Sequence, residues 1–194
     1  AEELSEVLNT KVVIGRINMG LLNRIIIDDV LLDDQSGQEM LKVTRLSAKF
    51  DIMPFFKGKI SISSVQLFGF NINLRKETPD SPPNFKFVLD AFASKDTVKK
   101  ENSLDLRINS ILIRRGRMSY HVLSEEETPG KFNAKHIQLQ NIIANISLKA
   151  LSKDSLNLGI KRLSLDEKAS GFSLKKMSLK LVANNKQTNI DILQ

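Results

Sequence analysis

Eight residues near the start of the chain, Ile25-Ile26-Ile27-Asp28-Asp29-Val30-Leu31-Leu32, carry a pattern that recurs along the sequence. Apolar residues stand at positions 25, 27, 30 and 32, which are offsets of 0, 2, 5 and 7. A helix does not collect these offsets on one face, and an unbroken strand places the two pairs on opposite faces. One extra residue in the middle, as in a β-bulge or tight bend, returns both pairs to one face. The segment therefore predicts a bulged strand with one aliphatic face.

The same offsets occur in five further places, and polar residues fill the middle of most of these copies. The copies are Ile60, Ile62, Val65 and Leu67; Leu106, Ile108, Ile111 and Ile113; Ile137, Leu139, Ile142 and Ala144; Leu158, Ile160, Leu163 and Leu165; and Phe172, Leu174, Met177 and Leu179. Gly69 and Gly116 follow two of them, and a glycine inside a strand pattern also marks a bulge or bend. The copies start at irregular intervals, so they indicate a repeated strand device without the fixed period of a solenoid.

Two short segments have helical spacing instead. Residues 2–8 begin with acidic residues, which the helix dipole favours, and residues 84–94 follow Pro82-Pro83, with Asn84 as the expected N-cap. One face of the second segment carries large apolar side chains, Phe85, Val88, Leu89 and Phe92. This segment is predicted to be an amphipathic helix that lies on an apolar surface at the rim of the sheet.

These patterns predict one mainly β domain over residues 1–194. We expect about ten antiparallel strands, joined by turns such as residues 33–37, in a curved sheet that forms an elongated groove or taco, with one or two short amphipathic helices. Two short helices cannot cover such a sheet, so a second sheet or a ligand must cover its apolar face. A closed β-sandwich is therefore the alternative. The positions expected to line the groove are Ile25, Ile27, Ile60, Ile62, Val65, Leu67, Phe70, Ile72, Leu106, Ile108, Ile111, Ile113, Leu163, Leu165, Leu174 and Leu179.

The composition leaves little for catalysis. Leu, Ile and Val make up 55 of the 194 residues, whereas Cys and Trp are absent. The lack of cysteine excludes disulfides, zinc–thiolate sites, iron–sulfur clusters and cysteine nucleophiles. The two histidines, His121 and His136, lie fifteen residues apart without a carboxylate at metal-ligand spacing, so we interpret them as structural or surface residues. No phosphate-binding loop, nucleophile elbow or zinc-protease helix is found, and we expect no enzyme, metal or cofactor.

The acidic and basic clusters each have a plain structural interpretation. Asp28, Asp29, Asp33 and Asp34 do not match a calcium loop, because apolar residues interrupt them; a solvated bend and a hairpin turn explain them. The net charge of +7 fits a solvated basic surface or an acidic partner such as phospholipid headgroups. The densest basic cluster, residues 114–117, has only Tyr120 near it, so nucleic acid is not expected as a partner.

Four segments resemble the AsmA and TamB superfamily of Gram-negative envelope proteins. Met53 to Phe70, a short hydrophobic segment followed by Gly and two strands, is similar to a recurrent element of that family. Leu104 to Tyr120 resembles its next hairpin, Leu163 to Phe172 resembles a later one in Bacteroidetes-type members, and Lys11 to Asn18 resembles the first strand after the membrane anchor. The resemblance implies a periplasmic β-groove lined by aliphatic side chains, anchored in the inner membrane by an N-terminal helix and linked to phospholipid movement towards the outer membrane.

The sequence thus predicts a fragment of a longer envelope protein, and the absence of Met before Ala1 fits a segment that precedes it. We expect the groove to shield phospholipid acyl chains in lipid transport or envelope biogenesis. Basic residues at strand ends are expected to attract headgroups weakly: Lys57, Lys59, Arg114, Arg115 and Arg117. The alternative is a non-catalytic scaffold or assembly factor for outer-membrane proteins, with an outer-membrane barrel protein as a partner of a C-terminal region outside this chain.

Overall fold

The structure is a computed structural model that describes residues 2–50, 62–93, 109–151, 155–184 and 188–193. It is mainly β, with 66% of the described residues in strands, and these residues form one mixed sheet of nine strands that does not close into a barrel. The strands are β1 (Val12–Gly20), β2 (Arg24–Asp33), β3 (Glu39–Phe50), β4 (Ile62–Lys76), β5 (Ser110–Val122), β6 (His136–Leu151), β7 (Ser155–Glu167), β8 (Ser173–Asn184) and β9 (Thr188–Leu193). The predicted mainly β, open and curved fold is confirmed.

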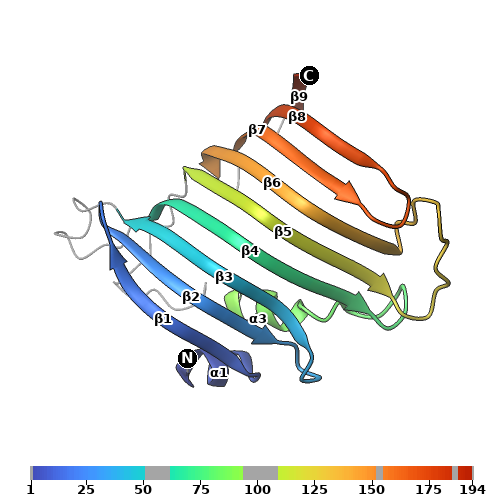
Figure 1. Ribbon diagram of the computed structural model, residues 1–194, viewed down its shortest axis with the longest axis horizontal. Coiled ribbons are helices and arrows are strands. Elements are labelled where there is room, and N and C mark those ends of the chain that lie inside the picture. The colour runs from blue at the N-terminus through green and yellow to red at the C-terminus, as the bar shows by residue number, and fades with distance from the viewer. Residues whose placement is uncertain (1, 51–61, 94–108, 152–154, 185–187, 194) are drawn as a thin grey trace.

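The strands lie in the sheet in their sequence order, from β1 to β9 (Figure 1). Every neighbouring pair is antiparallel except β4 and β5, which run parallel. A parallel pair requires a crossover of a dozen or more residues. Residues 77–109 provide that connection, and the prediction of an entirely antiparallel sheet is therefore wrong at this one pair.

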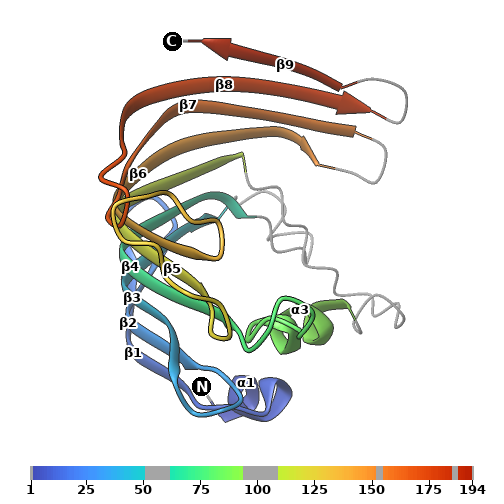
Figure 2. The same cartoon turned by 90° about the vertical axis from the view of Figure 1, so that its right-hand side faces the viewer.

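The sheet is a single curved layer, and both helices lie on its concave side (Figure 2). These helices are α1 (Glu2–Leu8) and α3 (Lys86–Ala93), close to the two predicted segments. Asn84 does not act as the expected N-cap. Its side-chain amide oxygen instead accepts a hydrogen bond from the Arg75 backbone N–H at 3.0 Å. This bond joins the residues before the helix to β4.

A row of left-handed residues and bulges crosses the middle of the sheet, and we call it the bulge row. Left-handed backbone conformations occur at Asp29 in β2, Gly69 in β4, Arg115 in β5 and Asn141 in β6, with φ between 54° and 65°. In β7 the pairing with β8 shifts register between Ile160 and Leu163. The bulge or tight bend predicted in the middle of the first and fourth copies in the chain is thus confirmed at residues 28–29 and 140–141, and the left-handed Gly69 marks another bend as predicted.

Candidate functional site

The apolar face of the sheet is built around three buried side chains from adjacent or nearby strands, Val43, Phe70 and Ile142. Partly buried apolar side chains pack around them: Val30, Leu41, Leu46, Leu67, Ile72, Ile113, Met118, Leu139 and Leu165. The members come from β2 to β7, so the cluster extends across most of the sheet. We refer to this side of the sheet as the apolar face.

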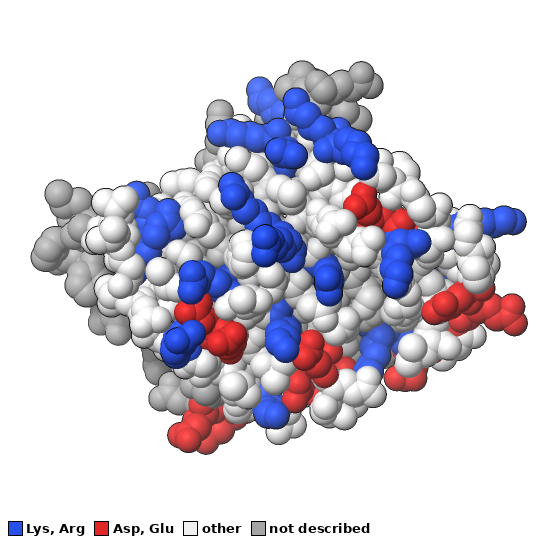
Figure 3. Space-filling view, in the orientation of Figure 1, with Lys and Arg blue, Asp and Glu red and all other residues white. Residues whose placement is uncertain are grey.

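The apolar face is the concave side of the sheet. Figure 3 shows the opposite, convex side, over which Lys and Arg side chains are spread. Asp28 pairs there with Arg45, at 2.6 Å between carboxylate and guanidinium, whereas the next residues along, Ile27 and Leu46, point the other way. Because of the bulge row, apolar side chains stay on the concave side and charged side chains on the convex side along both halves of the long strands.

Glycine at position 116 allows side chains to pack closely at the centre of the apolar face. A Cβ at Gly116 would lie 2.4 Å from two ring carbons of Phe70 and 3.1 Å from Cβ of Ile142. The ring of Phe70 therefore occupies the space that a side chain at 116 would need.

The structure places the described members of the predicted lining set on strands of this sheet. Ile25 and Ile27 pair with Ala48 and Leu46 across β2 and β3. The others in the described part of the chain are Ile62, Val65, Leu67, Phe70 and Ile72 in β4, Ile111 and Ile113 in β5, Leu163 and Leu165 in β7, and Leu174 and Leu179 in β8. Ile60, Leu106 and Ile108 lie outside the described residues.

No second layer of described strands packs on the apolar face, whose central side chains are nevertheless buried. Among the described elements, strands contact only their sheet neighbours, α3 packs against α1, and α1 packs against β1. At the β1 edge Ile17 and Met19 are 63% and 78% exposed, although they continue the apolar rows of β2. The sandwich alternative requires a second strand layer on this face, and the described strands form only one layer.

The predicted rim helix lies beside α1 on the concave side (Figure 2). Phe85 precedes the helix and is half-buried, as is Val88, whereas Leu89 is 57% exposed. Phe92 belongs to the helix. The helix thus presents apolar surface near one wall of the concave side.

The arginines predicted to attract headgroups at a rim do not lie at strand ends. Arg114, Arg115 and Arg117 are exposed in the middle of β5, on the convex face. The guanidinium of Arg115, at the bulge, lies 5.1 Å from the centre of the Phe68 ring on that face. Lys57 and Lys59 lie outside the described residues. The positions of the three arginines therefore give no support to a headgroup site at the mouth of the concave side.

Three of the four acidic residues of positions 28–34 are not solvated, which corrects the sequence interpretation, whereas Asp29 is exposed as expected for a solvated bend. Asp28, Asp33 and Asp34 are buried. Hydrogen bonding to Arg45 holds the pKa of Asp28 below its ordinary value. Burial raises the pKa of Asp34, but hydrogen bonds from Ser36, Asn84 and Gln38 outweigh it and lower that pKa overall.

A buried ion pair ties the turn between β2 and β3 to the end of β4. The Asp34 carboxylate accepts from a guanidinium N–H of Arg75 at 2.7 Å and from the amide of Asn84 at 3.2 Å. The same carboxylate accepts from the backbone N–H groups of Ser36 and Gln38. The predicted turn is confirmed, but its partners Arg75 and Asn84 are 41 and 50 residues away in sequence, so spacing gave no signal for them.

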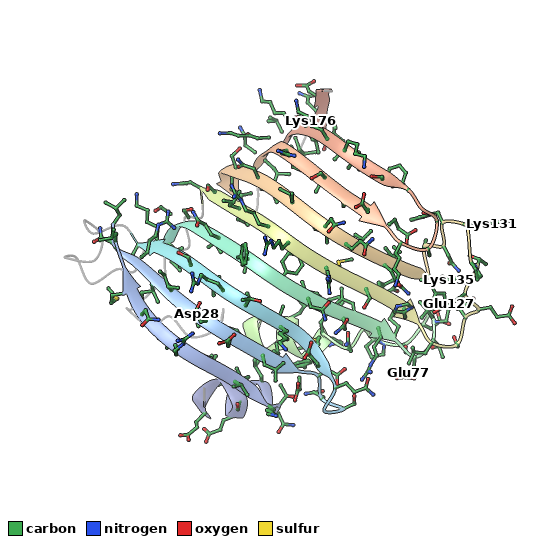
Figure 4. The ribbon with its side chains drawn as sticks, viewed as in Figure 1. Asp28, Glu77, Glu127, Lys131, Lys135 and Lys176 are labelled. Atoms are coloured by element: carbon green, nitrogen blue, oxygen red, sulfur yellow. The ribbon has the colours of Figure 1, made fainter. Side chains whose placement is uncertain are left out.

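The two histidines also have a carboxylate beside them, contrary to the sequence interpretation. His121 and His136 face each other across β5 and β6, and the side chain of Glu127 reaches them from the loop that joins these strands. Figure 4 labels Glu127 at this end of the sheet. Glu127 lies in neither strand pattern, so its position depends on the loop conformation.

The fold and the apolar face define a single-layer, open β-sheet protein with an aliphatic concave side. No helix in the described part of the chain is both long and apolar enough to cross a membrane. A scan against protein-family models finds no family that matches the chain, and a search of curated proteins finds no matching sequence.

Proposed function

We propose that the apolar face shields the acyl chains of phospholipids. The observation that carries this proposal is the aliphatic surface that several strands contribute to one side of a single sheet, with exposed apolar residues such as Ile17 and Met19 at its edge. Large exposed apolar surfaces in a soluble domain mark binding sites for apolar partners.

Aliphatic lining suits a flexible hydrocarbon chain better than a folded protein partner. Among the residues of the central cluster, Phe70 is the single aromatic, and the others are Val, Leu, Ile and Met. Aromatic and arginine anchors, by contrast, dominate protein–protein hot spots. Burying half of the methylenes of a sixteen-carbon acyl chain stabilises binding by on the order of 6 kcal/mol. The headgroup would remain in solvent at the open side.

The resemblance to AsmA and TamB proteins supports the same function and extends it. In this proposal the chain is a periplasmic section of an inner-membrane-anchored protein, and it carries lipid between membranes or supports envelope biogenesis. An outer-membrane barrel partner would bind a region outside this chain. These statements rest on the resemblance of the quoted segments alone.

Lipid carriage is tested by native mass spectrometry of gently purified chain, followed by lipid extraction. Leu67→Asp and Ile113→Asp place a carboxylate on the apolar face, and we expect either variant to lose bound phospholipid while it stays folded by circular dichroism. Leu112→Asp is the matched control, because Leu112 neighbours Ile113 on β5 and points to the opposite face.

Two results would contradict the proposal. One is wild-type chain that carries no phospholipid and takes none up from vesicles of phosphatidylethanolamine and phosphatidylglycerol. The other is equal loss of lipid in the apolar-face variants and in Leu112→Asp. Either result would favour the scaffold alternative, in which protein contacts carry the function.

A further inference from the structure

The ends of β5 and β6 bring the two histidines of the chain into direct contact. His121 pairs with His136 in register, and their Nδ1 atoms lie 3.0 Å apart. The ring centres are 5.3 Å apart and the ring planes are tilted by 54°. Met118 packs into the apolar cluster, and the regular pairing that follows it puts His121, three residues on, on the convex face.

The surroundings of His136 select one tautomer. Its Nε2 lies 2.9 Å from the backbone carbonyl oxygen of Glu125, and a carbonyl can only accept a hydrogen bond. Nε2 therefore carries a hydrogen, and in the neutral ring Nδ1 keeps a lone pair, which accepts from the Nδ1–H of His121 and is available to a metal ion once that hydrogen moves to Nε2 of His121. This lone pair is directed at His121. Metal-binding histidines are held in the same way, with the distal ring N–H donated to a carbonyl or carboxylate.

Glu127 completes a set of three ligand atoms. Its Oε1 lies 3.8 Å from Nδ1 of His121 and 4.0 Å from Nδ1 of His136. With the 3.0 Å between the nitrogens, these distances place one point about 2.1 Å from all three atoms. Bonds from Zn²⁺ to imidazole nitrogen and carboxylate oxygen have lengths of about 2.0 to 2.2 Å.

Small movements would bring the three atoms to tetrahedral spacing. Ligand atoms of a tetrahedral zinc ion are about 3.3 Å apart, so the carboxylate oxygen would move inward by about 0.5 to 0.7 Å. The side chain of Glu127 is 64% exposed and free to adjust, whereas the side chain of His136 is 8% exposed and held in place. The site therefore has one nitrogen held in place, on His136, and one adaptable oxygen, on Glu127.

We propose that His121, His136 and Glu127 bind a zinc ion at this end of the sheet. Two imidazoles and one carboxylate suit zinc, whereas Ca²⁺ and Mg²⁺ prefer oxygen ligands throughout. Three protein ligands leave a fourth position for water. Next to it lies a hollow of about 230 Å³, whose lining includes His136, Glu127, Asn133 and Lys168.

The backbone around the site already holds the loop in place. The Val122 N–H donates to the Lys135 carbonyl, and the Glu125 N–H donates to the Val122 carbonyl. The loop is also tied by an ion pair between Lys135 and Glu125 at 2.6 Å. The bound ion would add a further link, which joins the loop through Glu127 to both strands. This site is on the convex face, so the zinc proposal does not depend on lipid binding to the apolar face.

Zinc binding is measured on the purified chain after chelation and dialysis, by titration of Zn²⁺ in competition with a chromogenic zinc indicator. We expect one ion per chain and a rise in Tm when it binds. His121→Ala and His136→Ala should each weaken binding by at least about tenfold, and Glu127→Gln should weaken it in the same direction. Glu126→Gln is the matched control, because this neighbouring loop carboxylate is exposed and is not part of the cluster. Mg²⁺ at the same concentrations should give no signal.

Long-range ¹H–¹⁵N NMR identifies the atoms that bind, since the chain has only two imidazole rings. We expect Zn²⁺ to shift the Nδ1 resonances of both rings and to leave Nε2 of His136 protonated. The proposal is overturned if binding is unchanged in folded His136→Ala chain, if Glu126→Gln weakens it as much as Glu127→Gln does, or if zinc shifts neither Nδ1 resonance.

Discussion

Leu67 and Phe70 are three residues apart in β4, yet both pack into one apolar cluster. Residues three apart on a regular strand point to opposite faces. Gly69 lies between them with φ of 65°, and this left-handed residue bends the strand so that Phe70 returns to the side of Leu67. The same spacing joins Val43 to Leu46 and Leu139 to Ile142. The continuous apolar face therefore depends on the bulge row.

Replacing Gly69 should destabilise the sheet through both strain and contact. A Cβ at this position would lie 2.7 Å from Oγ1 of Thr44. Gly37→Ala is the matched control, because Gly37 has φ of 79° but no atom within 4 Å of a Cβ. We expect Gly37→Ala to cost about 1 to 2 kcal/mol in unfolding free energy from backbone strain. Gly69→Ala should cost about 1 to 3 kcal/mol more from overpacking, as measured by urea denaturation. Equal costs would show that the contact with Thr44 is unimportant.

Gly116→Ala tests the packing of Phe70 without backbone strain, since φ of Gly116 is not positive. We expect a loss of about 1 to 3 kcal/mol, because the new methyl would overlap the Phe70 ring. Phe70→Leu should reduce that penalty, so the double variant should be more stable than the sum of the single costs by at least about 0.5 kcal/mol. Additive costs in this double-mutant cycle would contradict the contact between these two residues.

The hydrophobic pattern predicted the features that depend on local order. The offsets of residues 25–32 predicted a bulge at Asp28-Asp29, and the structure has it at Asp29. The spacing of residues 2–8 predicted α1. Each of these depends on a few neighbouring residues, because the two faces of a strand alternate with a fixed period.

Features that depend on the path of long connections were not predicted. The parallel pairing of β4 and β5 depends on the long connection between them, residues 77–109. The hydrophobic alternation of a strand carries no information about the direction in which it runs. The approach of Glu127 to the two histidines is set by a loop fold, and the placement of Arg115 on the convex face is set by its own left-handed conformation. Sequence spacing alone cannot encode these tertiary placements.

Two arginine–aspartate pairs of similar geometry differ in the burial of the arginine and should differ in their contribution to the free energy of unfolding. The Arg75 side chain is 20% exposed beside Asp34, whereas the Arg45 side chain is 55% exposed beside Asp28. Arg75→Ala would leave a buried carboxylate without its cation, and we expect a loss of about 3 kcal/mol in unfolding free energy. Arg45→Ala should cost clearly less, because the exposed Arg45 side chain covers the buried Asp28 carboxylate, and its removal lets water reach that carboxylate. Similar costs for the two variants would show that burial does not separate the pairs.

Glu167, at the end of β7, should make the stability of the sheet depend on acidic pH. Its buried carboxylate accepts from the Ser170 hydroxyl at 2.5 Å and from the backbone N–H groups of Ser170, Ala169 and Gln138. Burial acts to raise the pKa of Glu167, but these hydrogen bonds outweigh it and lower the pKa from 4.5 to about 2.

A carboxyl whose pKa is lower in the folded chain stabilises the fold above its unfolded pKa, and this contribution disappears as pH falls through the folded pKa. The contribution of Glu167 should thus be complete above about pH 5.5, decline below the unfolded value of 4.5, and be lost near pH 2. Glu167→Gln cannot ionise and presents an amide to some of the same N–H donors. We expect it to be less stable than wild type by about 2 kcal/mol near neutral pH, with the difference shrinking as pH falls from about 4.5 towards 2.

Urea denaturation of both chains across this range measures the difference directly, and Asp28 and Asp34 cancel in it because both chains contain them. Glu77→Gln, at an exposed position, serves as the control and should leave the profile unchanged. A wild-type minus Glu167→Gln difference that stays constant with pH would show that the Glu167 carboxylate does not stabilise the fold through its charge.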